Sequence, residues 1–261
     1  MRTVNGHSVA LQAHRGVSTD RPENTMTAFR AAVEQGYDYI ELDPKFTKDN
    51  VCVVLHDRTL DRTARTAEGE KAPEGLRIAD ITYAEACGYE YGSWFAPEYR
   101  GEKLPTLEEA LVYARENGIP VKIDNVIESF TEEQTDILFG IVEKTGMQAL
   151  AAFTCTKPEY LEKVVARFPA TTIHYDGHVD AEKLETVCSI LRVNPLVVWL
   201  PYPTYLNSWC KAPVVSDERV AMVREKGAKL GLWILEEEAH LTDCCDRFKP
   251  DLIETTGSIK P

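Results

Sequence analysis

Short apolar runs alternate along the chain with longer amphipathic stretches. Several runs are apolar at every position, as in 196–200, which is typical of strands buried on both faces of a parallel sheet. Their spacing leaves room for a helix between most neighbouring pairs. The predicted strands cover residues 9–14, 39–46 with 51–56 close behind, 120–124, 149–154, 171–175, 196–201, 229–235 and 251–255.

The stretches between these strands show helical periodicity and helix-end signals. Asn24 or Thr25 can cap the first helix, Gly36 follows it, and Ser216 precedes a later one. Three further glycines, at 118, 146 and 227, follow other helices, as expected for residues that close a helix. The predicted helices cover residues 25–35, 106–117, 131–145, 158–167, 181–191, 217–226 and 236–247.

Counting 39–46 and 51–56 as one position gives eight strands with helices between them, which predicts an α/β fold of the (β/α)8 TIM-barrel type. The alternative is an open, doubly wound sheet. The last helix is missing, because the chain stops six residues after Thr255. We expect one domain over residues 1–261, a common size for a single barrel. Residues 58–103, too long for a simple connection, are expected to form a small insertion after the second barrel strand.

Composition narrows the classes of function. The 29 basic and 42 acidic residues give a net charge of −13, which disfavours nucleic acid and anionic lipid as partners. No apolar run is long enough to span a bilayer. The seven cysteines show no zinc-like spacing, and the first residues lack the apolar core of a signal peptide. We therefore expect a reduced, cytoplasmic protein without stable membrane association; the sequence does not indicate its oligomeric state.

The predicted strand ends carry polar residues that could perform chemistry. In a barrel these ends meet at one face, where active sites lie. Side chains two apart on a strand share a face, so Glu41 and Asp43 project together, as do Lys122 and Asp124. Three carboxylates at one place suit Mg²⁺, Ca²⁺ or Mn²⁺. The other candidates at strand ends are two histidines and an arginine, namely His14, His56 and Arg15.

Each of these residues also has a purely structural interpretation. Carboxylates in barrels are often salt-bridged, and an isolated histidine such as His14 or His56 is more often a hydrogen-bonded structural residue. The functional interpretation gains weight because these residues end successive predicted strands.

A series of short motifs over the first 110 residues resembles the N-terminal half of the glycerophosphodiester phosphodiesterase family. The motifs are H-R-G at 14–16, P-E-N-T at 22–25, E-L-D at 41–43, T-K-D at 47–49, V-L-H-D at 54–57, L-D-R-T at 60–63 and P-T-L-E-E at 105–109. Similarity in the second half is weaker. The resemblance implies a metal-dependent (β/α)8 barrel that hydrolyses glycerophosphodiesters to an alcohol and glycerol 3-phosphate.

The resemblance also implies roles for individual residues. It makes His14 and His56 the acid–base pair and Arg15 a phosphate contact. Glu41 and Asp43 correspond to two ligands of the divalent cation. Glu23 and Asn24 would shape the site, although Asn24 could instead cap the first helix, and Asp57 would orient a neighbouring group.

The sequence departs from the family at the third metal ligand. An E-x-K strand is replaced by Asp124-Asn125-Val126, which places Asp124 at the ligand position and removes a lysine. Lys122 or Lys45 could restore the lost charge, or could form a structural ion pair.

The strand ends near the C-terminus differ from the family as well. Glu254 and Glu236 could contact the leaving group, and Trp233 is expected to form a pocket wall or to pack in the core.

Two other functions remain open at this stage. One is a phospholipase D-like enzyme of the same barrel superfamily that acts on lysophospholipid or sphingomyelin. The other is a barrel that binds phosphodiesters without cleaving them.

Overall fold

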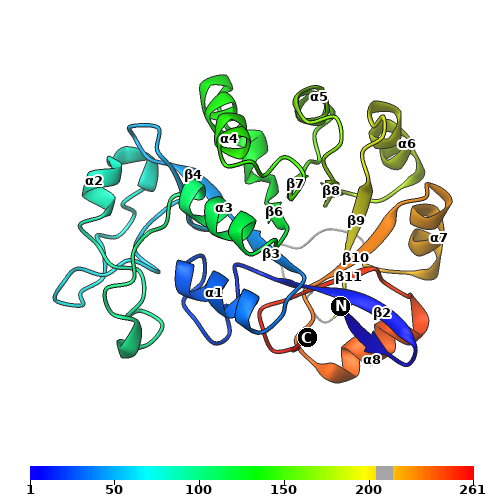
Figure 1. Cartoon of the computed structure of the whole chain (residues 1–261), viewed down its shortest axis with the longest axis horizontal. Helices are drawn as coiled ribbons and strands as arrows, with labels where there is room; N and C mark the ends of the chain where they lie inside the picture. The colour runs from blue at the N-terminus through cyan, green and yellow to red at the C-terminus, as the bar shows by residue number, and fades with distance from the viewer. Residues whose placement is uncertain (204–213) are drawn as a thin grey trace.

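The computed structural model describes residues 1–203 and 214–261, in which eight parallel strands close into a barrel (Figure 1). β2 pairs with both β3 and β11, which closes the ring. The predicted (β/α)8 TIM barrel is therefore confirmed. The barrel strands are β2 (His7–Ala13), β3 (Tyr39–Leu42), β6 (Val121–Ile123), β7 (Ala151–Thr154), β8 (Ile173–Tyr175), β9 (Leu196–Pro201), β10 (Lys229–Trp233) and β11 (Leu252–Thr255).

Helices surround the strands, as Figure 1 shows. Thr106 and Thr131 begin their helices with reciprocal side-chain and backbone hydrogen bonds that satisfy free N–H groups. Thr25, not Asn24, caps the first helix and accepts from the backbone N–H of Ala28. The barrel helices are α1 (Met26–Glu34), α3 (Leu107–Glu116), α4 (Glu132–Lys144), α5 (Pro158–Arg167), α6 (Ala181–Ile190), α7 (Asp217–Glu225) and α8 (Glu238–Arg247).

Two strands near the start of the chain differ from the prediction. β1 (Arg2–Val4) forms an antiparallel hairpin with β2 through Asn5 and Gly6, both with positive φ, a pattern that an Asn-Gly pair favours. Residues 51–56 were expected to continue the second barrel strand, but they do not belong to the barrel. β4 (Pro44–Phe46) and β5 (Cys52–Val54) instead pair antiparallel as a separate two-stranded sheet.

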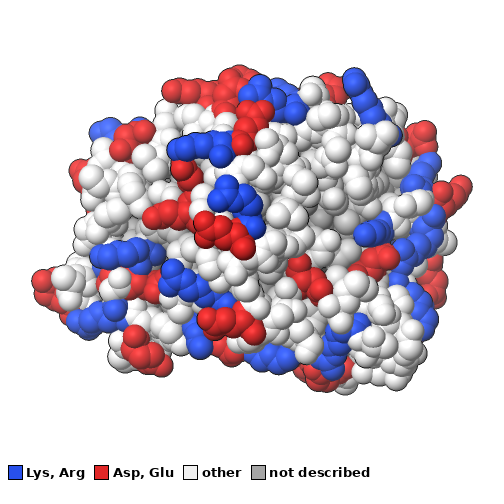
Figure 2. Space-filling view, in the orientation of Figure 1, with Lys and Arg blue, Asp and Glu red and all other residues white. Residues whose placement is uncertain are grey.

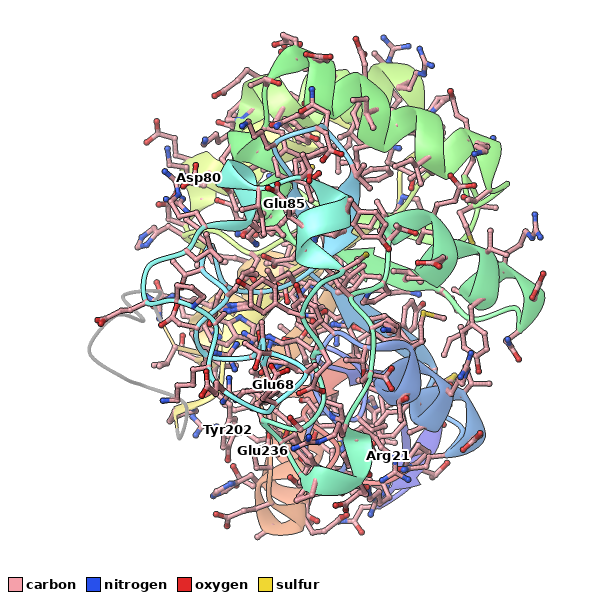
Figure 3. All side chains as sticks on the ribbon, turned by 90° about the vertical axis from the view of Figure 1, so that its left-hand side faces the viewer. Arg21, Glu68, Asp80, Glu85, Tyr202 and Glu236 are labelled. Carbon is pink, nitrogen blue, oxygen red and sulfur yellow. The ribbon has the colours of Figure 1, made fainter. Side chains whose placement is uncertain are left out.

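The insertion follows this small sheet and contains η1 (Ile78–Asp80), α2 (Tyr83–Ala86) and η2 (Pro97–Tyr99). It projects to one side of the barrel in Figure 1 and faces the viewer in Figure 3. Its apolar residues pack into a cluster separate from the main core, which explains how a segment poor in regular structure stays folded. The buried members are Val53, Leu55, Leu60, Ala64, Ala72, Ile78, Ala86, Tyr91 and Leu104.

The barrel interior is apolar below and polar toward the mouth. Trp199 fills the lower part, and Gly231 leaves room for its ring, since a Cβ there would lie 2.4 Å from a ring carbon. Above it, Glu41 and Lys122 lie opposite each other in register on β3 and β6, as do Gln12 and Glu254 on β2 and β11. The strands therefore carry a buried ring of charged and polar groups to the mouth.

The outer surface shows basic and acidic side chains intermixed on the face drawn in Figure 2. Within residues 1–203 and 214–261, no helix combines the length and the apolar character needed to cross a bilayer.

Candidate active site

Nine of the residues proposed from the sequence for the site line one cavity of about 150 Å³ at the barrel mouth. This agrees with the rule that the carboxyl ends of barrel strands converge on a single face. The nine are His14, Arg15, Glu41, Asp43, His56, Lys122, Asp124, Trp233 and Glu254, and Asp176 and Ile234 complete the lining.

The loop after β2 shapes one wall of this cavity through its backbone. Arg15 and Gly16 have φ values of 58° and 77°, and a Cβ at Gly16 would lie 2.7 Å from Ala28 of α1. Only glycine allows this close approach of loop and helix. The turn directs the backbone N–H of Arg15 at Glu41, to which it donates over 2.8 Å.

Asn24 ties the same loop to the second strand. Its side-chain amide donates to Asp43 over 2.7 Å, and the Arg15 Nε lies 3.4 Å from the same carboxylate oxygen. Burial alone would raise the pKa of Asp43, but Arg15, His56 and other positive groups outweigh it, so the pKa is lowered. Asp43 is therefore held as a carboxylate.

At the other two proposed metal ligands, Glu41 and Asp124, positive groups do not outweigh the effect of burial. Burial, followed by the charge of Asp43 and other carboxylates, raises the pKa of Glu41 well above its usual value. The same two causes, in the same order, raise the pKa of Asp124. The three carboxylates thus repel one another in a site that water reaches poorly.

This donor set fits a hard divalent cation, because oxygen ligands and excess negative charge are what Mg²⁺, Ca²⁺ and Mn²⁺ require. In the part of the chain that the structure describes, however, no three histidine, cysteine, aspartate or glutamate side chains stand together in a metal-binding arrangement. The balance of charge among the three carboxylates supports cation binding.

His14 directly follows β2 and is partly buried, with 15% of its side chain exposed. Its Nε2 lies 4.0 Å from Glu41, and its Nδ1 has no hydrogen-bond partner among the described residues. Burial is the main cause that lowers the pKa of His14, to about 4. The ring is therefore neutral near pH 7 and able to accept a proton.

His56 belongs to a chain of ion pairs at the rim. Its Nδ1 lies 2.7 Å from Asp57, which also accepts from the Nε of Arg62 over 2.5 Å. Both guanidinium nitrogens Nη1 and Nη2 of Arg62 donate to Glu23, which pairs with Arg15 as well. Burial would raise the pKa of Glu23, but these two arginines outweigh it and lower the pKa. The insertion, through Arg62, thus connects His56 to the proposed phosphate contact Arg15.

Lys122 lies deep in the cavity and pairs with Glu254, at 3.1 Å between Nζ and Oε2. Gln12 also donates to this carboxylate, and the Lys122 ammonium lies 4.5 Å from the centre of the Trp199 ring. Burial opposes the charged forms of both partners, yet their attraction raises the pKa of Lys122 and lowers that of Glu254. The lysine charge is largely balanced by Glu254.

Lys45 lies on a different side of the mouth. Together with Val126, the residue at the family's lysine position, it lines a second cavity of about 390 Å³. This cavity shares Asp43, His56 and Asp124 with the first.

Glu236 does not face either cavity. Its carboxylate accepts hydrogen bonds from the backbone N–H and the hydroxyl of Thr256, and it also binds Ser258. The carboxylate thus holds the loop after β11, and the predicted contact between Glu236 and a leaving group stays a prediction.

Asp176 was missed by the sequence analysis, although it directly follows β8 and so meets the same strand-end criterion as Asp43. Burial is the main cause that raises the pKa of Asp176, to about 7, and a hydrogen bond from Trp233 acts in the opposite direction. Trp233 thus lines the cavity and donates a hydrogen bond to Asp176.

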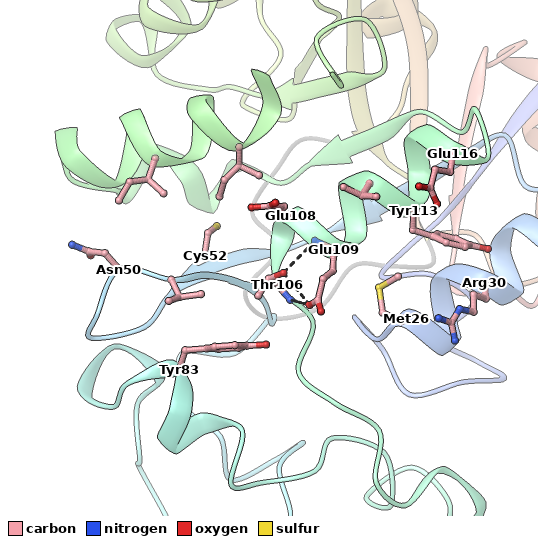
Figure 4. Close-up of a pocket in the computed structure, with 14 residues that line it drawn as sticks. Met26, Arg30, Asn50, Cys52, Tyr83, Thr106, Glu108, Glu109, Tyr113 and Glu116 are labelled. Carbon is pink, nitrogen blue, oxygen red and sulfur yellow. Dashed lines mark hydrogen bonds between the residues drawn. The ribbon is translucent and has the colours of Figure 1, made fainter. Parts of the chain in front are cut away.

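A larger cavity, of about 740 Å³, lies outside the barrel between α1, α3, α4 and β5 (Figure 4). Its polar lining includes Arg30, Glu108 and Glu116, and neither His14 nor His56 reaches it. Size alone therefore does not identify the reaction site, since the acid–base and cation-binding candidates all meet in the smaller cavity.

Comparisons with known proteins agree with the resemblance seen in the motifs. Residues 14–249 match the Glycerophosphoryl diester phosphodiesterase family. A glycerophosphodiester phosphodiesterase of Caldanaerobacter subterraneus is 40% identical over 112 residues, 43% of each chain. The chain matches less than two thirds of the length of the first curated relatives.

Two solved structures support the fold. A protein of Silicibacter pomeroyi superposes with a TM-score of 0.79 at 18% identity, over 97% of this chain and 91% of that one. An Oleispira antarctica phosphodiesterase, solved with the product sn-glycerol-3-phosphate, gives 0.75 at 21% identity, over 95% and 93%.

Proposed function

Because the chain belongs to the glycerophosphoryl diester phosphodiesterase family, we propose that it hydrolyses glycerophosphodiesters to an alcohol and glycerol 3-phosphate. The observation that carries the proposal is the meeting of two histidines, an arginine and three carboxylates around one cavity. A relative of the same fold was solved with sn-glycerol-3-phosphate, which supports the product.

Glu41, Asp43 and Asp124 would hold a divalent cation, Mg²⁺, Ca²⁺ or Mn²⁺. When bound, the cation supplies positive charge to the phosphate oxygens. Arg15 adds a guanidinium that Glu23 and Asp43 hold in place, a geometry suited to a phosphate.

The two histidines divide the proton transfers. His14 is neutral and its Nδ1 has no partner among the described residues, so it accepts a proton from the nucleophile, which is water or the glycerol 2-hydroxyl. His56 protonates the departing alkoxide, and the Asp57 carboxylate beside its Nδ1 orients the ring. Lys122 supports the reaction indirectly, since it keeps Glu254 charged on the inner wall of the cavity.

We also propose that the barrel and the insertion form one catalytic domain over residues 1–261. Arg62 supports this, because it comes from the insertion and contacts both Glu23 and Asp57.

The test is hydrolysis of glycerophosphocholine, glycerophosphoethanolamine and glycerophosphoglycerol with Mg²⁺, Ca²⁺ or Mn²⁺, with enzymatic detection of glycerol 3-phosphate. We expect release of glycerol 3-phosphate that stops in excess chelator. A lysophospholipid and sphingomyelin in the same panel test the phospholipase D-like alternative.

His178→Ala is a matched control for histidine variants, since His178 is exposed and outside the cavity. Absence of turnover with every diester and every cation would contradict the proposed function.

A further inference from the structure

The second cavity at the mouth, which we call the outer cavity, begins where the proposed reaction takes place. It lies between β4 and η3 (Asn125–Ser129), the segment after β6. Because it shares Asp43, His56 and Asp124 with the inner cavity, a substrate bound at these residues extends into it.

The inner cavity is the smaller of the two at the mouth. Its volume is about 150 Å³, against about 390 Å³ for the outer cavity. Asp176 and Glu254 on its walls offer acceptors for polyol hydroxyls. The alcohol portion of the diester is therefore left for the outer cavity.

Three of the eleven residues that line the outer cavity are cationic and three are acidic, although the whole chain carries −13. Lys45 lies beside Asp43 and Asp124, whose charges act on it. Within the described ranges, neither Arg58 nor Lys157 lies within ion-pair distance of a carboxylate. The Lys157 ammonium donates only to a backbone carbonyl, that of Glu128, over 3.2 Å.

Glu128 is the acidic residue that lines the outer cavity but not the inner one, and its carboxylate already accepts hydrogen bonds. Glu128 accepts from the backbone N–H and hydroxyl of Thr156 and from the backbone N–H of Lys157, at 2.6 Å for the last two. It is thus engaged by the loop after β7, and the exposed cations Arg58 and Lys157 remain available to a ligand.

We propose that the outer cavity binds the alcohol portion of the diester and selects alcohols that carry an additional anionic group. This inference rests on the proposed phosphodiesterase function. An anionic group placed there gains charge-assisted hydrogen bonds from side chains that otherwise have no ion-pair partner. A quaternary ammonium in the same place meets like charge.

The test compares three diesters that differ in the charge of the alcohol: glycerophosphoglycerate, glycerophosphoglycerol and glycerophosphocholine. The first two differ only by a carboxylate in place of a hydroxymethyl group. We expect kcat/KM to be about tenfold higher for the glycerate diester than for the glycerol diester, the effect of one charge-assisted hydrogen bond, and lowest for the choline diester.

The variant Arg58→Gln/Lys157→Gln removes two cations, both exposed, from the outer cavity. Its ratio of kcat/KM for the glycerate and glycerol diesters should fall to about one. The matched control, Arg77→Gln/Lys183→Gln, removes the same net charge from exposed positions that do not line the cavity, and should keep the ratio.

Calorimetric Kd values for the same diesters separate this inference from the proposed function. Equal Kd values, or tighter binding of the choline diester, overturn the charge selection. A retained ranking in Kd without any turnover overturns the hydrolytic function alone.

Discussion

Two parts of the site balance their charges in opposite ways. We call the carboxylates Glu41, Asp43 and Asp124 the floor, and the ion-paired residues Glu23, His56, Asp57 and Arg62 the rim. On the floor, Glu41 and Asp124 are buried beside other carboxylates, and their pKa values are raised. On the rim, Arg62 bridges Glu23 and Asp57 with short ion pairs, and burial of Asp57 is outweighed so that its pKa is lowered. The carboxylates of the rim are paired with an arginine, whereas Glu41 and Asp124 on the floor lie beside other carboxylates, which the proposed cation would neutralise.

This difference separates two kinds of contribution to the reaction. Because we propose that the floor holds a cation, changes there should alter metal affinity and turnover together. The rim positions His56 and Arg15, so changes there should alter turnover and leave the metal in place. The predictions below test this division, from the largest expected effect to the smallest.

Asp43→Ala should lower kcat by about 10⁴-fold or more, because loss of cation binding removes several kcal/mol of transition-state stabilisation. Calorimetry should show weakened binding of Mn²⁺ or Ca²⁺ as well. Asp124→Asn in metal-free protein should not lower Tm, since it removes a repelling charge. Full turnover in excess chelator would contradict the role assigned to the floor.

His14→Ala and His56→Ala should each lower kcat by about 10²–10⁴-fold, the usual contribution of a general acid or base. The double variant should lose much less than the product of the two effects, since the residues act in one reaction. Metal affinity should stay within a few-fold in the His56 variant. A nearly normal kcat for either single variant, measured beside His178→Ala, would assign that histidine a structural role.

Lys122→Met should destabilise the protein by about 3–5 kcal/mol, because it leaves Glu254 buried without its partner. Denaturant unfolding measures this, and the double variant Lys122→Met/Glu254→Gln should recover a large part of the loss. If Lys122→Met instead keeps full stability and lowers kcat at least tenfold, the lysine acts on the substrate directly.

Arg62→Met should lower kcat by about tenfold with little change in metal affinity. It removes the two hydrogen bonds that hold Glu23 and the one that holds Asp57, so His56 loses its orientation. Arg62→Lys should restore little, since a lysine cannot bind two carboxylates with this geometry. The exposed Lys71→Met, also in the insertion, is the control, and a parallel loss of metal binding in Arg62→Met would blur the distinction between rim and floor.

The barrel and the members of its site were predictable because both depend on local order along the chain. Apolar runs of strand length, separated by capped helices, specify eight βα units. Once the strands are parallel, every strand end lies at one mouth, so a residue such as His14 or Asp124 is placed by its position alone. The same rule would have found Asp176, which directly follows β8.

The pairing of these side chains was decided only by the tertiary structure. Lys122 and Glu254 are 132 residues apart, and they meet because β2 pairs with both β3 and β11 to close the ring. Glu236 shares the acidic character of Glu254, yet it accepts a hydrogen bond from Thr256 and does not line the cavity.

The path of the chain after β3 was decided in the same way. The sequence shows two β-like runs at 39–46 and 51–56, and packing determines that the second pairs with β4 outside the barrel. This places His56 at the rim and brings Arg62 to Glu23. Periodicity along the sequence determines where a strand begins and which face a residue occupies. Which side chains pair with one another depends on which of them are buried together, and the whole fold decides that.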